Sequence, residues 1–226
     1  MLNLRHGILE TTRTYSTLLN KLSAYWKFED VSCYDIFRVL DGSIVGAVTF
    51  VPGKINNSAT FYANGIRITV PDSNIWTFTA DACSFSFFSW VLLSAEQPGS
   101  YSQVFGSNVG TAWSFQMNKT AHPSYRLLIY DGAALTSDPL TFDMSTWYHV
   151  GFIKSNRNLA FYRNGVKVKD VSTTGSGNPT GMTFGDDSLS EPFRGQIDES
   201  GHWNRVLTES EVTELYNSGK GKSFPF

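Results

Sequence analysis

Hydrophobic and polar residues alternate in short runs along most of this chain, which is the period of a strand with one buried and one exposed face. Gly, Pro, Asn and Ser, the residues that favour turns, separate these runs. The predicted strands cover residues 23–29, 47–51, 58–62, 66–70, 84–94, 101–106, 112–118, 125–130, 146–153, 159–163, 166–170 and 196–203. About a dozen strands with this spacing predict an all-β fold, a two-sheet antiparallel sandwich of the jelly-roll type with one short C-terminal helix.

The run from Ser84 to Ser94 predicts a strand at the centre of a sheet. Its first half alternates, whereas its second half is apolar at every position from Trp90 to Leu93. A strand that is covered by protein on both faces requires such a continuous apolar run. We therefore expect this strand to have neighbours on both edges and packed layers on both faces.

Two Asn-Gly pairs predict hairpin turns, because Gly tolerates the positive φ angle that a two-residue turn demands. Asn64-Gly65 is expected to join residues 58–62 to residues 66–70. Asn164-Gly165 is expected to join the strands at 159–163 and 166–170 in the same way. Both pairs of strands are therefore predicted to be antiparallel neighbours within one sheet.

The hairpin at Asn164-Gly165 also predicts a register. A two-residue loop pairs Arg163 with Val166, and Phe161 with Val168. In this register the apolar residues of both strands share one face and the polar residues share the other. Agreement between the turn and the alternation supports this pairing.

The sequence near the C-terminus predicts one short helix. Thr208 is a candidate N-cap, and Glu211 follows at the spacing of a capping box. Leu207 and Val212 occupy the positions of a hydrophobic staple. Gly219 is expected to take the left-handed conformation that ends a helix. A helix this short is marginal in water, so we expect it to pack against the sandwich.

Residues 1–22 differ in pattern from the rest of the chain. Ile8, Tyr15 and Leu22 fall on a seven-residue stripe that could line a helix, although four nearby threonines weaken helix formation. The segment is either a frayed arm or an arm that docks onto a partner chain. Chain ends order only where they are tied down, so we favour docking, with residues 23–226 as one domain.

The composition excludes several classes of protein. With 226 residues, 41% hydrophobic and 15% aromatic, the chain suits one large globular β domain. The net charge of −2 provides no basic field for nucleic acid. No apolar run reaches the roughly 18–20 residues that span a bilayer. Glu10 and Arg13 interrupt any apolar signal core, so export through the standard secretory route is not expected.

The cysteines and histidines predict no reactive centre. Cys33 and Cys83 are either buried thiols or a single bridge, and the spacing leaves both open. None of the four histidines lies in a metal-binding pattern. His149 lies in an apolar strand and His202 lies beside Trp203, so both are expected in the core or at an interface.

The segment Gly195–Gly219, which runs Gly-Gln-Ile-Asp-Glu-Ser-Gly-His-Trp into the predicted helix, carries the clearest likeness to a known family. It resembles the closing motif of laminin G-like domains, which belong to the concanavalin A-like lectin/glucanase superfamily. The ending Gly219–Phe226 is similar to endings of phage and environmental bacterial members. The resemblance implies a laminin G-like sandwich over residues 23–226.

Two further segments carry a weaker likeness. Ser23–Glu29 resembles the opening strand of laminin G-like domains, and Trp147–Val150 followed by Phe161–Gly165 resembles their middle. Many members of this family bind calcium at the rim of the sandwich. Calcium prefers carboxylate, amide and carbonyl oxygens on loops. The positions of this chain nearest to such ligands are Asp41, Asn57 and Asp198. The alternative is that Asp198 accepts backbone N–H groups and caps a turn.

Glycosidases of this superfamily place carboxylates two residues apart on one strand, so that both face the substrate. The acidic pairs of this chain are adjacent instead: Glu29-Asp30, Asp186-Asp187 and Asp198-Glu199. Neighbouring residues of a strand face opposite ways, so Asp198 and Glu199 are expected to point apart. We therefore expect a protein that is not an enzyme.

Sugar-binding proteins use aromatic side chains as platforms beside polar groups on exposed loops. Tyr101, Trp113 and Tyr130, with Asp131, lie on or near loops between the central predicted strands and are the candidate carbohydrate-binding residues. With 33 aromatic residues in the chain, a place in the core is the alternative for each of them.

These observations favour a non-catalytic phage virion or surface protein, located in the capsid decoration or the tail. It is expected to dock onto the virion through residues 1–22, to be an oligomer, and to display a lectin-like domain for host-surface glycans. The alternative is a free carbohydrate-binding module or lectin. A glycosidase is the third and least favoured hypothesis.

Overall fold

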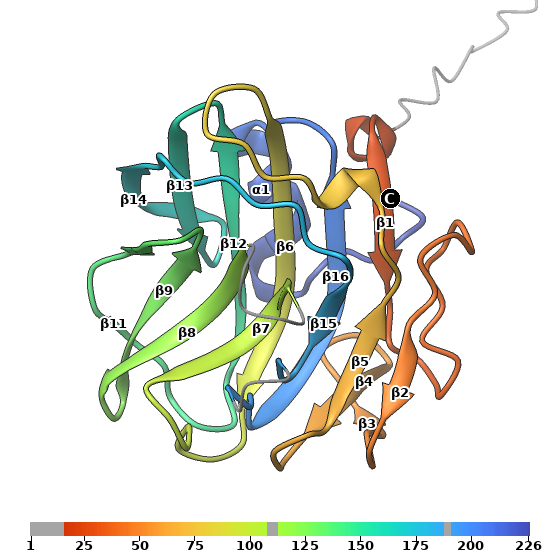
Figure 1. The fold of residues 1–226 in the computed structure, drawn as a ribbon. Coiled ribbons are helices and arrows are strands. Elements are labelled where there is room, and N and C mark those ends of the chain that lie inside the picture. The colour runs from red at the N-terminus through yellow and green to blue at the C-terminus, as the bar shows by residue number, and fades with distance from the viewer. Residues whose placement is uncertain (1–15, 108–112, 188–190) are drawn as a thin grey trace, which may run out of the picture.

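The computed structural model describes residues 16–107, 113–187 and 191–226. These residues form two antiparallel β-sheets that pack face to face, with one short helix on the outer side of one sheet (Figure 1). This arrangement confirms the predicted all-β sandwich with a C-terminal helix. Each sheet contains eight strands, so the described chain holds more strands than the dozen predicted.

The first sheet, sheet A, is built around the strand predicted to be central. In spatial order it contains β14 (Val166–Ser172), β13 (Asn158–Arg163), β12 (Trp147–Ser155), β6 (Ser84–Leu93), β16 (Gly195–Trp203), β4 (Asn57–Phe61) and β3 (Thr49–Pro52), with β1 (Leu22–Trp26) also paired to β16. β6 pairs along its length with β12 on one edge and β16 on the other. The prediction of a central strand buried on both faces is confirmed.

The second sheet, sheet B, forms the front layer in Figure 1. In spatial order it contains β10 (Ala134–Thr136), β9 (Ser124–Tyr130), β8 (Ser114–Ala121), β7 (Tyr101–Ser107), β15 (Met182–Phe184), β5 (Arg67–Val70) and β2 (Ser43–Val45), with β11 (Leu140–Thr141) paired to β9. The inner face of this sheet packs on sheet A, and its outer face is the one turned toward the viewer.

Aromatic side chains make up about half of the buried residues in the core between the sheets. Phe87 of sheet A stacks on Phe105 of sheet B, with 4.7 Å between the ring centroids and 6° between the planes. Trp26 and Trp76 stack beside them at 6.3 Å. Large rings bury much apolar area and pack edge-to-face or offset, so they account for much of the stability of this core. Many of the aromatic residues of the chain are therefore needed to fill the space between the two sheets.

The helix α1 (Glu209–Tyr216) begins as the sequence predicts. The Thr208 side chain accepts a hydrogen bond from the Glu211 backbone N–H, and the Glu211 carboxylate accepts one from the Thr208 N–H, so the predicted capping box is confirmed. Val212 and Leu215 on its apolar face belong to a second hydrophobic cluster, on the outer side of sheet A, that also contains Phe88 and Trp203. The helix ends earlier than predicted, because Asn217, not Gly219, takes the first left-handed conformation at φ 48°.

Residues 16–22 belong to the domain. A 3₁₀ turn (Thr17–Leu19) buries Leu18, whose carbonyl accepts a 2.7 Å hydrogen bond from the Trp203 indole. Leu22 begins β1, the strand that pairs with β16. The end of the predicted 1–22 arm is therefore part of the sandwich, and residues 1–15 of that arm lie outside the described residues.

The two Asn-Gly pairs join strands in different ways. Asn164-Gly165 joins β13 to β14 in a hairpin, as predicted. Asn64-Gly65 instead connects β4 of sheet A to β5 of sheet B, so the predicted hairpin there is wrong. Gly65 does adopt positive φ, at 76°. The turn forms as its residues dictate, but β4 finds its partners in β3 and β16, and β5 finds its partners in β2 and β15.

The predicted register of the hairpin at Asn164-Gly165 is correct only next to the turn. Arg163 pairs with Val166 as predicted. A β-bulge then follows, and it places Phe161 opposite Lys169 instead of Val168. A bulge inserts one extra residue on one strand, so every pair beyond it shifts by one. Val166 is 65% exposed and does not share the buried face of Phe161.

The two cysteines are free thiols, Cys33 buried and Cys83 half-buried, so the alternative of a single bridge is wrong. Burial raises the pKa of the Cys33 thiol to about 12. A protonated thiol is a weak nucleophile, so Cys33 behaves as a small core residue. Among the described residues, no helix is long and apolar enough to cross a membrane.

Candidate functional site

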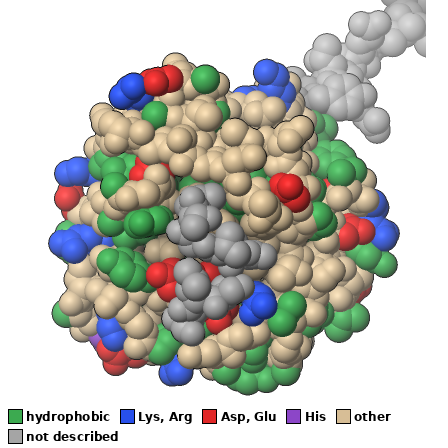
Figure 2. Space-filling model, viewed as in Figure 1, with side chains coloured by type: hydrophobic (Ala, Val, Ile, Leu, Met, Phe, Trp, Pro, Cys, Tyr) green, Lys and Arg blue, Asp and Glu red, His purple; other side chains and the backbone are tan. Residues whose placement is uncertain are grey.

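A cavity of about 280 Å³ opens on the outer face of sheet B. Its lining comes from four neighbouring strands and from the segment that follows β15. The lining residues are Tyr101, Gln103, Ser114, Gln116, Tyr130, Ala134, Asp187 and Glu191. Figure 2 shows acidic side chains gathered at the middle of this face, between apolar patches.

The strand period explains why polar side chains line the cavity. On β8, Ser114 and Gln116 line it, whereas the alternating Phe115 and Met117 are buried in the core between the sheets. Successive side chains of a strand point to opposite faces, so one strand supplies both the core and the cavity. Gln103 does the same on β7.

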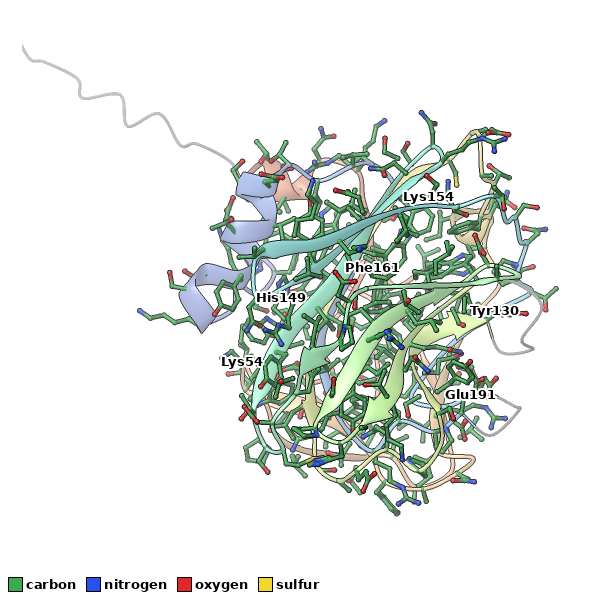
Figure 3. The ribbon with its side chains drawn as sticks, turned by 90° about the vertical axis from the view of Figure 1, so that its left-hand side faces the viewer. Lys54, Tyr130, His149, Lys154, Phe161 and Glu191 are labelled. Carbon is green, nitrogen blue, oxygen red and sulfur yellow. The ribbon has the colours of Figure 1, made fainter. Side chains whose placement is uncertain are left out.

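Two tyrosines border the cavity. Tyr101, at the start of β7, is 40% exposed, and Tyr130, at the end of β9, is 39% exposed. Both had been predicted as carbohydrate-binding residues, and the fold brings them to one cavity. Tyrosine offers an apolar ring face and a polar hydroxyl, which suits contact with a sugar. Figure 3 places Tyr130 and Glu191 on the side of the molecule opposite α1.

The amide side chains of the cavity are held by hydrogen bonds. Gln103 is buried, and its Nε2 donates to Oγ1 of Thr183 at 2.5 Å. Gln116 is buried as well, and its Nε2 donates to Oε2 of Glu191. Buried amides with fixed partners present their remaining donors and acceptors in a set orientation. The floor of the cavity is therefore polar and preorganised.

Two carboxyl groups, those of Asp187 and Glu191, line one side of the cavity, and Asp186 directly precedes Asp187 in the chain. The Glu191 backbone N–H donates to Oδ1 of Asp187 at 3.1 Å, and the Gly65 N–H donates to Oδ2 of Asp186 at 2.6 Å. Burial raises the pKa of Glu191 to about 7, and the charge of Asp187 raises it further while the hydrogen bond from Gln116 lowers it. Burial also raises the pKa of Asp186. This side of the cavity can therefore hold a proton near neutral pH.

Trp113 does not lie in this cavity, which corrects its predicted role. Its side chain is fully buried, and its indole N–H donates to the Trp76 carbonyl at 2.7 Å. The ring packs on Phe85 and Phe152, with centroids 5.3 and 5.6 Å away. A ring enclosed in this way cannot present a face to a sugar, so Trp113 is a core residue.

Asp131 is held in place by local hydrogen bonds. It is 5% exposed, and its Oδ2 accepts a hydrogen bond from the Thr173 hydroxyl. Its Oδ1 accepts from the Ala133 N–H at 3.2 Å, which closes the turn after β9. Asp131 is absent from the lining of the cavity, although it follows Tyr130 directly. Its contacts position the turn that carries Tyr130.

The predicted calcium ligands take part in local hydrogen bonds. Both carboxylate oxygens of Asp198 accept backbone N–H groups, those of Lys54, Ile55 and Glu199. Donors that point at these oxygens occupy the directions from which a cation would bind. This is the turn-capping role that was the alternative for Asp198, and burial raises its pKa.

Asp41 and Asn57 serve similar local roles. Asp41 accepts the Asp35 N–H and forms an ion pair with Arg38. The Asn57 amide donates to the Glu29 carbonyl at 2.9 Å. Among the residues that the structure describes, no three His, Cys, Asp or Glu side chains form a group that could hold a metal ion. Asp41, Asn57 and Asp198 thus all have local hydrogen-bond partners, and calcium binding at these positions stays a prediction.

The buried histidines are structural, as expected. His202 lies in the core with Nδ1 at 2.7 Å from the Ser23 hydroxyl, and burial lowers its pKa to about 3. His149 stacks on Phe88, with 5.3 Å between the ring centroids, and burial likewise lowers its pKa to about 3. Neutral imidazoles of this kind contribute packing without charge.

The sequence reasoning missed most of the cavity. It did not single out Gln103, Ser114, Gln116 or Glu191, and it treated Asp187 only as a member of an adjacent acidic pair. One signal was present: polar residues that alternate with Phe and Met on residues 112–118 mark a polar outer face. The contribution of the segment after β15 carried no local signal, because its place against β7 and β8 is a long-range contact.

Comparison with known proteins gives one family and a set of structural relatives. Residues 63–213 match the family model Laminin_G_3, described as the concanavalin A-like lectin/glucanases superfamily. No curated protein matches the sequence. Many solved structures share the fold.

Three of these structures illustrate the range of relatives. Domain 4 of AbnA, an extracellular arabinanase from Geobacillus stearothermophilus, in complex with arabinotriose, has a TM-score of 0.71 at 21% identity, over 87% of this chain and 98% of that one. The binding domain of Paraclostridial Mosquitocidal Protein 1 has a TM-score of 0.72 at 16% identity, over 88% and 52%. Trypanosoma rangeli sialidase in complex with the inhibitor DANA has a TM-score of 0.67 at 17% identity, over 89% and 34%.

At these identities the likeness is one of fold alone. This chain spans nearly the whole of the arabinanase domain, about half of the toxin binding domain and about a third of the sialidase. In each of these three relatives the fold is one part of a larger protein.

Proposed function

This chain belongs to the concanavalin A-like lectin/glucanase superfamily, and on that premise we propose that it is a non-catalytic glycan-binding domain. The site is the cavity on the outer face of sheet B. Its ligand is one or two sugar units of an oligosaccharide, since about 280 Å³ is at the small end of the usual range for ligand cavities.

One observation carries the proposal: Tyr101 and Tyr130, both about two-fifths exposed, border a cavity whose floor contains the buried amides of Gln103 and Gln116. Sugars have apolar faces and a rim of hydroxyl groups. Aromatic rings contact the faces, and buried amides donate to and accept from the hydroxyls. An aromatic border with a polar floor supplies both kinds of contact in one place.

A structural relative supports this proposal. The arabinanase domain, almost all of which this chain covers, was solved in complex with arabinotriose. Since the identity is 21%, this likeness supports the class of ligand and not the particular sugar. The binding domains of toxins among the relatives agree with a role in attachment.

A glycan array followed by calorimetry tests the proposal. We expect the wild-type protein to bind at least one oligosaccharide, and Tyr130→Ala or Tyr101→Ala to weaken that binding at least about tenfold, the loss of one stacked ring. Tyr34→Ala is the matched control, because Tyr34 is 49% exposed and lies outside the cavity. Unchanged binding in both cavity variants would overturn the proposed site.

A second candidate function is hydrolysis at the same cavity. Glu191, with a pKa raised to about 7, and Asp187 resemble the acid and carboxylate pair that glycosidases use. Hydrolysis of a bound oligosaccharide that disappears in Glu191→Gln would favour it. Binding without turnover, retained in Glu191→Gln, would favour the non-catalytic function.

We also propose that the domain is displayed on a phage particle, through the N-terminal arm. The family-like ending at residues 219–226 supports this location, and the packing of residues 16–22 on the domain limits the docking segment to residues 1–15. Light scattering tests it: the full chain is expected to form an oligomer, and a chain without residues 1–15 is expected to be a monomer. Equal masses would contradict docking through this arm.

A further inference from the structure

The lining of the cavity on sheet B is acidic. Asp187 and Glu191 line it, and Asp186 is buried directly before Asp187 in the chain. Among the eight lining residues that the structure describes, none is Lys, Arg or His. Arg67 is the cation that acts on Asp186, whose pKa it lowers. The described lining of the cavity therefore contains two carboxyl groups and no basic side chain.

Two other carboxyl groups act on Glu191. Burial raises the pKa of Glu191 to about 7, and the charges of Asp187 and Asp186 raise it further. The Gln116 amide lowers that pKa by its hydrogen bond, but it brings no positive charge. In the ion pairs of the described residues, neither Asp186 nor Glu191 has a partner. Above neutral pH an ionised Glu191 therefore adds negative charge to a lining that, in its described residues, contains no Lys, Arg or His.

We propose that this cavity selects uncharged sugars and rejects sugars that carry a carboxylate, such as sialic and uronic acids. The inference rests on the proposed glycan-binding function and names the class of glycan that the site takes. Hydroxyl groups of a neutral sugar can donate to the carboxylates of Asp187 and Glu191 and accept from the second N–H of the Gln116 amide, whose first N–H bonds to Glu191. A carboxylate on the ligand meets no Lys, Arg or His among the described lining residues and faces acidic side chains.

The size of the effect follows from Coulomb's law. Two like charges about 6 Å apart repel strongly where protein lowers the effective dielectric constant well below that of water. Even after screening by salt, a ligand carboxylate is expected to bind at least about tenfold more weakly than the same oligosaccharide without it. The repulsion must fall as the ionic strength rises, which separates it from a purely steric rejection.

Matched pairs of glycans test this selectivity at pH 8, where Glu191 is ionised. The probes are an array of neutral oligosaccharides, each beside the same oligosaccharide capped with sialic acid or oxidised to the uronic acid. The proteins are the wild type, the double variant Asp187→Asn with Glu191→Gln, and Glu209→Gln, an exposed carboxylate on α1 that serves as the control.

We expect the wild type and Glu209→Gln to prefer the neutral member of each bound pair by at least about tenfold, and the double variant to reduce that preference to about threefold or less. Wild-type binding of acidic and neutral members with equal affinity, while Tyr130→Ala abolishes both, would overturn the charge selectivity and leave the glycan-binding function intact. Binding of no glycan would overturn both proposals.

The double variant can also lose its fold, because Asp187 and Glu191 are bonded to each other and to Gln116. In that case the proposal is tested by the way in which glycan binding by the wild type depends on salt. The preference for the neutral glycan is expected to shrink at least about threefold between 0.05 and 1 M salt, since screening at 1 M acts over about 3 Å. A preference that does not change with salt would overturn the proposal.

Discussion

The hydroxyl of Tyr25 donates a 2.5 Å hydrogen bond to Oε2 of Glu199, which joins the first strand of sheet A to the last across 174 positions of sequence. Both side chains are buried. Glu199 lies at the bulge of β16 with a left-handed φ of 46°. Burial raises its pKa to about 7, although the bond from Tyr25 acts in the opposite direction. The strand pair is thus held by a carboxyl group that is neutral at mildly acidic pH.

This pKa predicts how stability depends on pH. The folded-state pKa of Glu199, about 7, exceeds its ordinary value of 4.5, so its contribution to stability is complete below 4.5 and is lost as the pH rises through 7. Between pH 5 and pH 8, the wild type is expected to lose about 1–3 kcal/mol more unfolding free energy than Glu199→Gln. Urea unfolding at both pH values measures this difference; parallel losses would contradict it.

The buried His202 predicts the opposite dependence. Its folded-state pKa of about 3 lies below the ordinary 6.5, so its contribution is present above 6.5 and is lost as the pH falls toward 3. His202→Asn removes the titrating ring and keeps an acceptor for the Ser23 hydroxyl. Between pH 7 and pH 4, the wild type is expected to lose about 1–3 kcal/mol more stability than this variant. Equal acid sensitivity would show that His202 titrates normally.

The burial of Trp113 predicts a stability defect and not a binding defect. Trp113→Ala leaves a large cavity between the sheets and removes the bond to the Trp76 carbonyl, so it is expected to cost about 3–5 kcal/mol of unfolding free energy. Tyr130→Ala removes a half-exposed ring and is expected to cost at most about 1 kcal/mol. Urea unfolding of both variants measures the contrast. A stable Trp113→Ala protein would contradict the placement of this ring.

Arg205 is predicted to hold residues 16–22 against the helix. Its guanidinium donates to both carboxylate oxygens of Glu211 at 2.7 Å, and to the carbonyls of Asn20 and Thr17 at 2.7 and 2.9 Å. Lysine cannot reproduce this planar set of donors, so Arg205→Lys is expected to cost about 1–3 kcal/mol.

The control for Arg205 is Arg157→Lys. Arg157 pairs with Asp81, and both side chains are more than half exposed. An exposed ion pair contributes little, so this change is expected to leave the unfolding free energy close to that of the wild type. Thermal unfolding of the two variants gives the comparison, and similar shifts in both would show that the bonds of Arg205 add no stability.

The sequence alone was enough for features that depend on neighbours in the chain. The capping box of Thr208 and Glu211 was predicted and found, because both partners lie within one turn of the helix. The buried strand β6 was predicted from its apolar run. The turn at residues 164–165 was predicted from its Asn-Gly pair, and both residues do adopt positive φ. In each case the residues that determine the feature are close together in the chain, and few residue types can form it.

Tertiary structure decided what depends on distant partners. Asn64-Gly65 contains the same turn residues as Asn164-Gly165, yet it connects two sheets, because strand pairing is chosen by long-range contacts. The same holds for the site. Tyr130 and Trp113 are both aromatic residues at strand ends, and only the packing of sheet B on sheet A buries one ring and leaves the other at a cavity. Local alternation sets which residues share a face, but the second sheet determines which face is covered.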